Sequence, residues 1–276
     1  MIKNFHKRGF ITHIILVILG LFSLYPTIQM IMISLKTSEE VMISFNFFPH
    51  QPQWFNYIKI WREANLITYF RNSIIVTITT VLLVVIISSL GGYAFSRLNF
   101  RGKNVLFYLF LSGLMLPIYI AIFPLFIINN LLGLINNYLA LIGPYTAFGL
   151  PFSLYIIKNY FDTIPREIDE SAKIDGCSHI GIWWRIIMPV SKPVIVTVII
   201  LQFMNSWNEF FLALIFMTKP EMKTIPLIGV VYMTRYMYRY EMLFTGVVIA
   251  VAPIIVLYII LQRQFISGLT AGSVKG

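Results

Sequence analysis

The stretch that decides the fold class is NSIIVTITTVLLVVIISSLGGYAFS, residues Asn72–Ser96. It contains no Asp, Glu, Lys or Arg, and about 20 mostly apolar residues suffice for a helix to cross a bilayer. Similar apolar runs are Gly9–Leu35, Asn104–Ile157, Pro193–Met217 (interrupted only by Glu209) and Met242–Gln262. Because Asn104–Ile157 is too long for one span, its asparagine pairs at 129–130 and 136–137 divide it into two. The sequence therefore predicts an all-α, polytopic membrane protein with six transmembrane helices.

Composition agrees with this class and excludes others. Of the 276 residues, 58% are hydrophobic and 12% charged, against roughly 25% charged in a soluble domain. The net charge of +10 is expected from cationic cytoplasmic loops, so nucleic-acid binding is disfavoured. Lys and Arg number 13 on the side of both termini and 8 on the other. The positive-inside rule then places both termini in the cytoplasm.

The residues needed for several chemistries are absent from the sequence. The single cysteine, Cys177, and four scattered histidines disfavour a metal cluster or a Ser/His relay. No G-x-x-x-x-G-K-[ST] motif occurs, so any ATP that drives this protein is bound by another subunit.

Five of the eleven acids fall in one segment, DTIPREIDESAKIDG, residues Asp162–Gly176. Asp162 or Thr163 can cap a helix there, and Gly176 can end it in the left-handed conformation. Asp169 and Lys173 have the spacing of an i,i+4 ion pair. A thin apolar stripe beside a large polar surface predicts an exposed helix that docks on a partner.

The next segment, SHIGIWWRIIMP, predicts a second helix that begins at Ser178 and ends before Pro189. Its apolar residues follow the i, i+3, i+4, i+7 pattern that holds a helix against lipid or membrane helices; they are Ile180, Trp183, Trp184 and Ile187. The alternative is a simple connecting loop, but connections in compact structures are usually far shorter.

A family resemblance rests on this loop. Glu170-Ser171-Ala172, then Asp175-Gly176, then Ile186 and Met188-Pro189, resemble the E-A-A, D-G, I-x-L-P signature of permease subunits of ATP-binding cassette (ABC) importers. Ser171 replaces Ala and Met188 replaces Leu. Three other segments are similar to the maltose-type carbohydrate-uptake branch; they are Phe70–Ser73, Ser206–Phe210 and the ending Gly268–Gly276.

The resemblance implies a type I ABC importer permease fold in a bacterial cytoplasmic membrane. It implies one domain over 1–276, with the importer core at about 70–262, a coupling loop at 159–193 and a tail at 263–276. The implied partners are a second, different permease subunit, two cytoplasmic ATPase subunits that bind ATP and Mg, and an extracytoplasmic sugar-binding protein. This chain itself would hold no cofactor and catalyse no reaction.

The resemblance also implies residue roles in coupling. ATPase docking would fall to Glu170, Ser171, Ala172, Asp175 and Gly176. Tail coupling would fall to Gly268, Thr270, Gly272 and Lys275.

Glu209 is the one acid within a predicted span, close to its centre. An acid there costs roughly 2.5–3.5 kcal/mol and marks a functional site by default. With Asn205, Trp207 and Asn208 it is a candidate for lining the path of a carbohydrate, an oligosaccharide by our interpretation. The alternative is a hydrogen bond that packs two helices.

Two other classes of function fit the sequence less well than an importer does. A secondary transporter driven by an ion gradient would want paired intramembrane ionisable groups, and only Glu209 is available. An intramembrane hydrolase or glycosyl transferase would need convergent acids or a Ser/His pair, which the sequence does not offer.

Overall fold

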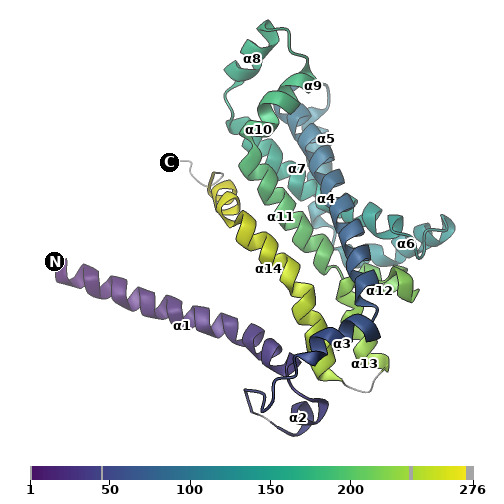
Figure 1. Cartoon of the computed structure of the whole chain (residues 1–276). Coiled ribbons are helices and arrows are strands. Elements are labelled where there is room, and N and C mark those ends of the chain that lie inside the picture. The colour runs from purple at the N-terminus through teal and green to yellow at the C-terminus, as the bar shows by residue number, and fades with distance from the viewer. Residues whose placement is uncertain (1, 45, 236–238, 272–276) are drawn as a thin grey trace. The chain divides into compact units, whose positions relative to one another are not determined.

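The computed structural model describes residues 2–44, 46–235 and 239–271, with side chains described for 12–44, 46–233 and 239–263. Every regular element in these ranges is a helix (Figure 1). The chain forms two compact units, Met1–Leu66 with Ile228–Ala252, and Ile67–Leu227 with Pro253–Gly276. The all-α prediction is confirmed for the described residues.

The first unit contains two long helices and three short ones. They are α1 (Ile2–Ser34), α2 (Ser38–Ile43), α3 (Phe55–Glu63), α13 (Ile228–Arg235) and the first part of α14 (Tyr240–Ala271). The Thr245 hydroxyl donates to the Ser34 carbonyl oxygen at 3.2 Å, which joins α14 to the end of α1. By contrast, the most apolar 18-residue window of α1, within Thr12–Ser34, has no residue buried in the chain, although Ser34 at its end is buried. An apolar helix with no protein cover is suited to lipid or another subunit.

A network of polar side chains surrounds the start of α14. Glu241 is buried and accepts hydrogen bonds from Ser38 Oγ at 2.7 Å and Arg239 Nε at 3.0 Å. Arg239 also contacts Glu63 at 3.2 Å. Partial burial alone would lower the pKa of the Arg239 guanidinium, but the hydrogen bonds and charges of Glu241 and Glu63 outweigh burial and raise it. The network therefore ties α2, α3 and α14 together.

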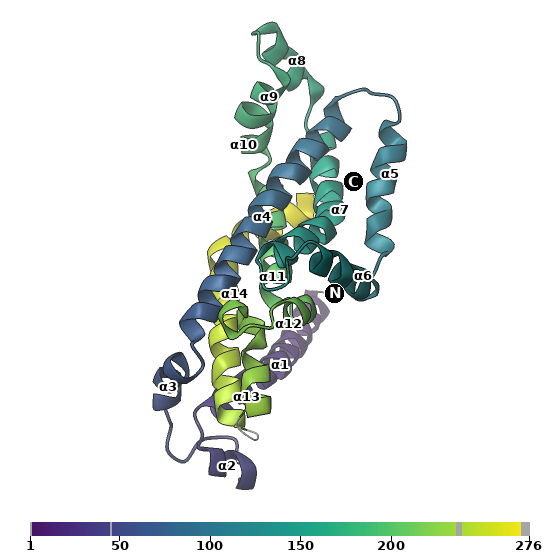
Figure 2. The same ribbon diagram turned by 90° about the vertical axis from the view of Figure 1, so that its right-hand side faces the viewer.

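The second unit contains the membrane helices around the loop at 159–193. Its longer helices are α4 (Leu66–Arg97), α5 (Lys103–Ser112), α6 (Ile118–Leu131), α7 (Leu139–Thr163), α8 (Arg166–Ile174) and α11 (Lys192–Asn208). Its shorter elements are η1 (Gly113–Met115), α9 (His179–Ile182), η2 (Trp183–Ile187), α10 (Met188–Val190), α12 (Phe211–Phe216), η3 (Pro220–Met222) and η4 (Ile225–Leu227). Both views place α8 and α9 at one end of this unit, beyond the ends of α4 and α7 (Figures 1 and 2).

Small residues let α4 approach α7 closely. A Cβ atom built on Gly91 would lie 2.7 Å from Leu154, and one on Gly92 would lie 2.9 Å from Ile157. Real Cβ atoms essentially never show contacts this short, so a larger residue at either position would force the facing side chain of α7 to move. Close backbone approach at small residues is a usual basis of helix packing in membranes. It fixes the scaffold from which the loop at 159–193 projects.

Four helices in the described part of the chain are long and apolar enough to cross a membrane; they are Thr12–Ser34, Leu66–Arg97, Leu139–Thr163 and Tyr240–Arg263. The number rises to six if each of two bent pairs is one span. These pairs are Lys103–Met115 with Ile118–Leu131, bent by 99°, and His179–Val190 with Lys192–Asn208, bent by 81°. The predicted six spans are therefore reached only when the bent pairs are counted.

Two predicted spans differ from a single straight helix. The third turns sharply between α5 and α6, where η1 ends and Pro117 adopts an extended conformation with ψ 133°. The fifth, predicted over Pro193–Met217, ends as a helix at Asn208 and resumes at Phe211. In contrast, Pro144 and Pro151 lie inside the continuous helix α7. Hydropathy alone does not distinguish these outcomes, because broken and continuous segments are all apolar enough to be candidate spans.

The tail also differs from its sequence pattern. Residues 263–271 lack helical periodicity, yet they continue α14 as far as Ala271. A helix can extend past its apolar stretch by propagation, because each added residue gains a backbone hydrogen bond.

Candidate functional site

A buried ion pair holds α8 to the end of α4. Arg97 Nε lies 2.6 Å from Asp169 Oδ2, with side-chain exposures of 5% and 7%. Arg97 Nη2 also donates to the carbonyl oxygen of Ile164 at 2.8 Å, in the turn before α8. The predicted Asp169–Lys173 pair is therefore wrong, because Asp169 points inward to α4 while Lys173 is exposed.

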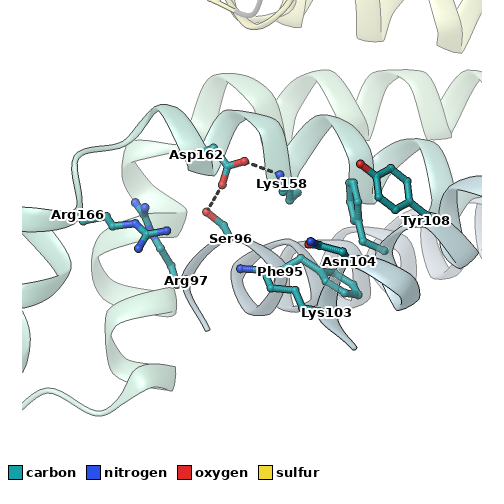
Figure 3. A pocket seen from close by; sticks show the side chains of 10 residues that line it. Phe95, Ser96, Arg97, Lys103, Asn104, Tyr108, Lys158, Asp162 and Arg166 are labelled. Atoms are coloured by element: carbon teal, nitrogen blue, oxygen red, sulfur yellow. Dashed lines mark hydrogen bonds and ion pairs between the residues drawn. The ribbon is translucent and has the colours of Figure 1, made fainter. Parts of the chain in front are cut away.

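A second contact holds the end of α7 to α4. Ser96 Oγ donates to Asp162 Oδ1 at 2.7 Å, and Lys158 Nζ lies 2.6 Å from Asp162 Oδ2 (Figure 3). The sequence suggested that Asp162 caps α8, but its carboxylate is bound to Ser96 and Lys158 instead. The helix begins at Arg166 after Pro165, with no side-chain cap. Asp162 instead joins the two spans from which the loop projects.

The remaining acids of α8 and its end face solvent. Glu167, Glu170 and Asp175 are exposed, as are Ser171 and Gly176. Gly176 has φ +83°, so the predicted left-handed helix end is confirmed. Ala172 differs from the other predicted docking residues, since it is 5% exposed and belongs to a buried apolar cluster with Ile164 and Ile182. Its methyl group therefore lies in the buried cluster at the base of α8 and not on the outer face of the helix.

The second loop helix is half buried and half exposed. Trp183 and Ile187 lie in the same buried cluster, whereas Ile180 is 72% and Trp184 61% exposed. The four predicted contact residues thus divide between two faces. The helix also runs through Pro189 to Val190, contrary to the predicted end. The π-helical turn η2 precedes Pro189 and changes the local hydrogen-bond register, which accommodates a residue without an N–H.

Glu209 lies at a break between helices α11 and α12. It is extended, with φ −66° and ψ 124°, and its carboxylate accepts the N–H groups of Leu212 at 2.9 Å and Ala213 at 3.2 Å. Tyr145 of α7 donates its hydroxyl to the same carboxylate at 2.5 Å. The acid therefore caps α12 and joins it to α7. These three donors supply the hydrogen bonds that a carboxylate requires within a membrane span.

Glu209 also borders a cavity of about 240 Å³. The cavity is lined by Ile118, Tyr145, Phe148, Gly149, Gln202, Asn205, Ser206 and Glu209. Two residues of the predicted path, Asn205 and Glu209, thus meet at one cavity. Trp207 is not part of its lining; it is 2% exposed and lies between Phe70 and Phe203. Asn208 is exposed and also lies outside the lining.

The sequence did not single out Tyr145 and Gln202 as residues of this cavity. Gln202 Nε2 donates to the carbonyl oxygen of Tyr145 at 3.4 Å and to Ser206 Oγ at 3.2 Å. A usable signal was Gly149, where an added Cβ would lie 2.4 Å from Gln202 Oε1. In the structure Gly149 admits a polar side chain between α7 and α11.

The predicted tail residues fall partly outside the described structure. Gly268 and Thr270 lie within α14, and their side chains are not described. Gly272 and Lys275 lie outside the described residues. A role of the tail in coupling stays a prediction. Among residues 12–44, 46–233 and 239–263, no group of three or more His, Cys, Asp or Glu side chains could hold a metal ion.

Comparisons with known proteins agree with this architecture. Residues 87–270 match the family described as binding-protein-dependent transport system inner membrane component. The chain is 37% identical to the probable ABC transporter permease protein YurM of Bacillus subtilis (strain 168), covering 91% of this chain and 84% of that one. It is 36% identical to the arabinooligosaccharides transport system permease protein AraQ of Halalkalibacterium halodurans, covering 92% of each.

A solved structure supports the fold. A bacterial ABC transporter involved in the import of the acidic polysaccharide alginate contains a chain that superposes with a TM-score of 0.81 at 22% identity, covering 94% of this chain and 97% of that one. With the family match over 87–270, which includes the helical loop and the Glu209 cavity, this shows that the chain belongs to the binding-protein-dependent transport system inner membrane components, the permease subunits of ABC transporters.

Proposed function

We propose that this chain is a permease subunit of an ABC importer that moves a carbohydrate across a bacterial cytoplasmic membrane. We propose further that this carbohydrate is an oligosaccharide. The family description supports a binding-protein partner on the outer side. The relative AraQ and the alginate importer are named for oligomeric or polymeric sugars. Two ATPase subunits and a second, different permease would complete the transporter. ATP and Mg would bind in the ATPases.

Coupling to the ATPases is assigned to the loop at 159–193. The observation that carries this assignment is the fixed base and free outer face of α8. Arg97 and Asp169, 2.6 Å apart and almost fully buried, hold the base. Glu170 and Asp175 remain exposed on the outer side. An element that transmits movement must be stiffly joined to the spans and open to its partner, and α8 meets both conditions. With this loop in the cytoplasm, both chain termini are cytoplasmic as well.

The transported carbohydrate is assigned to a path beside the Glu209 cavity. Asn205, Gln202, Tyr145 and Glu209 offer donors and acceptors there, and sites of this kind combine apolar walls with few polar groups. The ion-gradient alternative would need a second ionisable partner for Glu209. Among the lining residues, Glu209 is the only carboxylate, so we do not propose that alternative.

The test uses two glycines with the same backbone conformation. Gly176 ends α8 with φ +83° and its N–H donates to the Lys173 carbonyl oxygen at 3.0 Å. Gly133, in the loop between α6 and α7, has φ +66° and donates to the Asn130 carbonyl oxygen at 3.1 Å. Proline cannot adopt positive φ and lacks the N–H, so it disturbs both turns similarly.

Gly176→Pro should abolish sugar uptake and the stimulation of ATPase activity in reconstituted vesicles, while the chain still reaches the membrane. Gly133→Pro, the control, should retain coupling in the fraction that folds. Coupled transport by Gly176→Pro would refute the role assigned to α8.

A further inference from the structure

A second cavity lies where α4, α5, α7 and α8 meet. It has a volume of about 370 Å³, within the usual range of about 300–1,000 Å³ for ligand sites. Four cationic side chains line it, with Ser96, Asn104 and three aromatic residues (Figure 3). The cations are Arg97, Lys103, Lys158 and Arg166, and the only acid in the lining is Asp162.

The positive charge of this cavity is only partly neutralised. Arg97 is paired with Asp169, and Lys158 with Asp162. Both oxygens of Asp162 are already occupied, by Ser96 and Lys158. No acidic partner lies within ion-pair distance of the other two cations in the described part of the chain. Lys103 donates to the carbonyl oxygen of Leu98 at 3.0 Å, an acceptor without formal charge, and the charge of Asp162, which also acts on Lys103, is already paired with Lys158. Arg166 is exposed.

The backbone adds to this potential. Helix α5 begins at Lys103, and its N-cap, Gly102, provides no side-chain hydrogen bond. The N-terminal end of a helix carries partial positive charge. A bound anion would therefore meet two cationic side chains that are outside any ion pair in the described part of the chain, together with the positive end of α5.

The surroundings indicate where such an anion would come from. Helix α5 exposes a large hydrophobic surface, with Val105 73%, Leu109 65% and Tyr108 68% exposed. This helix begins one of the bent candidate spans. The cavity thus opens at the end of an apolar, exposed helix, beside the aromatic ring of Tyr108, and aromatic residues are enriched at the membrane interface. Basic pockets between membrane helices at this depth suit lipid headgroups.

We propose that this cavity binds the phosphate group of an anionic phospholipid, with Lys103 and Arg166 as the residues that select the negative charge. The inference goes beyond transport and coupling, because it requires only that α5 faces lipid. Since Arg166 is the first residue of α8, the bound lipid would also contact the base of the loop.

The experiment is a lipid titration of the full-length chain, purified with its associated subunits in neutral detergent and followed by native mass spectrometry. Phosphatidylglycerol is the probe, phosphatidylcholine is the zwitterionic comparison, and millimolar inorganic phosphate is the soluble competitor. Each basic side chain that meets an anionic headgroup contributes about a fivefold gain in affinity for the lipid. The double variant Lys103→Gln/Arg166→Gln should therefore bind phosphatidylglycerol about 30-fold more weakly.

The matched control is Arg101→Gln/Lys192→Gln, which removes the same charge from exposed residues outside the cavity lining. It should bind phosphatidylglycerol nearly as the unmodified chain does. The charge-conserving variant Lys103→Arg/Arg166→Lys should also retain binding, which separates loss of charge from loss of folding. Equal loss in the cavity and control variants would overturn the proposal. Displacement of the lipid by inorganic phosphate would assign the site to a soluble anion and overturn the lipid source.

Discussion

The ion pair between Arg97 and Asp169 provides a quantitative test of how the loop is held. The pair is 2.6 Å apart with side-chain exposures of 5% and 7%. Asp169→Ala removes the carboxylate and leaves the Arg97 guanidinium buried with only the Ile164 carbonyl oxygen as acceptor. Breaking a buried pair in this way costs about 3–5 kcal/mol. The cost should appear locally, as detachment of α8 from α4.

Hydrogen–deuterium exchange of the peptide that covers α8 measures this detachment in the purified full-length chain. A loss of about 3 kcal/mol corresponds to about a 150-fold higher population of the detached state. Amides of α8 should then exchange faster by up to that factor, limited by the exchange rate of an unfolded segment. ATPase stimulation by the sugar-loaded binding protein should fall in parallel, because a detached α8 no longer moves with the spans.

Two further variants separate the charge from the shape of the pair. In Arg97→Met/Asp169→Leu both charges are replaced by apolar side chains of similar size, and such replacements are often neutral. Exchange of α8 should return close to that of the unmodified chain. Lys59→Ala is the control, since its ion pair with Glu63 is 3.7 Å long and about one-third exposed and contributes at most about 1 kcal/mol. Unchanged exchange in Asp169→Ala would contradict the assigned role of the pair.

Three other variants test the remaining contacts. Glu209→Ala should lower the thermal stability of the purified chain by about 1–2 kcal/mol, because α12 loses its cap, whereas Glu209→Gln keeps one acceptor and should lose less; equal losses would contradict the capping role. Gly149→Ala should destabilise by about 1–3 kcal/mol through overlap with Gln202, whereas Gly143→Ala in the same helix meets nothing within 4 Å and should be neutral or stabilising in the same melting assay. Removal of residues 268–276 should impair ATPase coupling in vesicles without reducing the amount of chain in the membrane; normal coupling would refute a role for the tail.

Sequence patterns predicted the helical membrane fold because apolar run length is a property of one segment. The run Asn72–Ser96 lies within α4. The break at Glu209 was missed because it depends on Tyr145, a residue 64 positions away in the chain. A hydropathy pattern holds no information about such a partner. The high cost expected for an acid within a span did indicate that some compensating contact must exist.

The acidic segment illustrates the same limit and refines the proposed docking surface. The sequence pattern predicted that this segment, with its five acids, forms one exposed helix that docks on a partner. In the structure two of them, Asp162 and Asp169, are bound to α4 and α7 through Ser96, Lys158 and Arg97. The local i,i+4 rule selected Lys173 for Asp169, but a buried arginine from another helix competes better than an exposed lysine, because its interaction is less screened by water.

The other three acids, Glu167, Glu170 and Asp175, are exposed. The five acids therefore have two different roles, which their clustering in the sequence does not distinguish. The inward acids hold the loop to the spans, and only the outward acids remain available for the proposed ATPase contact. Charge reversal at Glu170 should therefore weaken ATPase binding without raising hydrogen exchange in α8, whereas Asp169→Ala should raise exchange first and weaken coupling as a consequence. A copurification assay beside the exchange measurement distinguishes the two, and faster exchange in Glu170→Lys would show that the outer face also supports the helix.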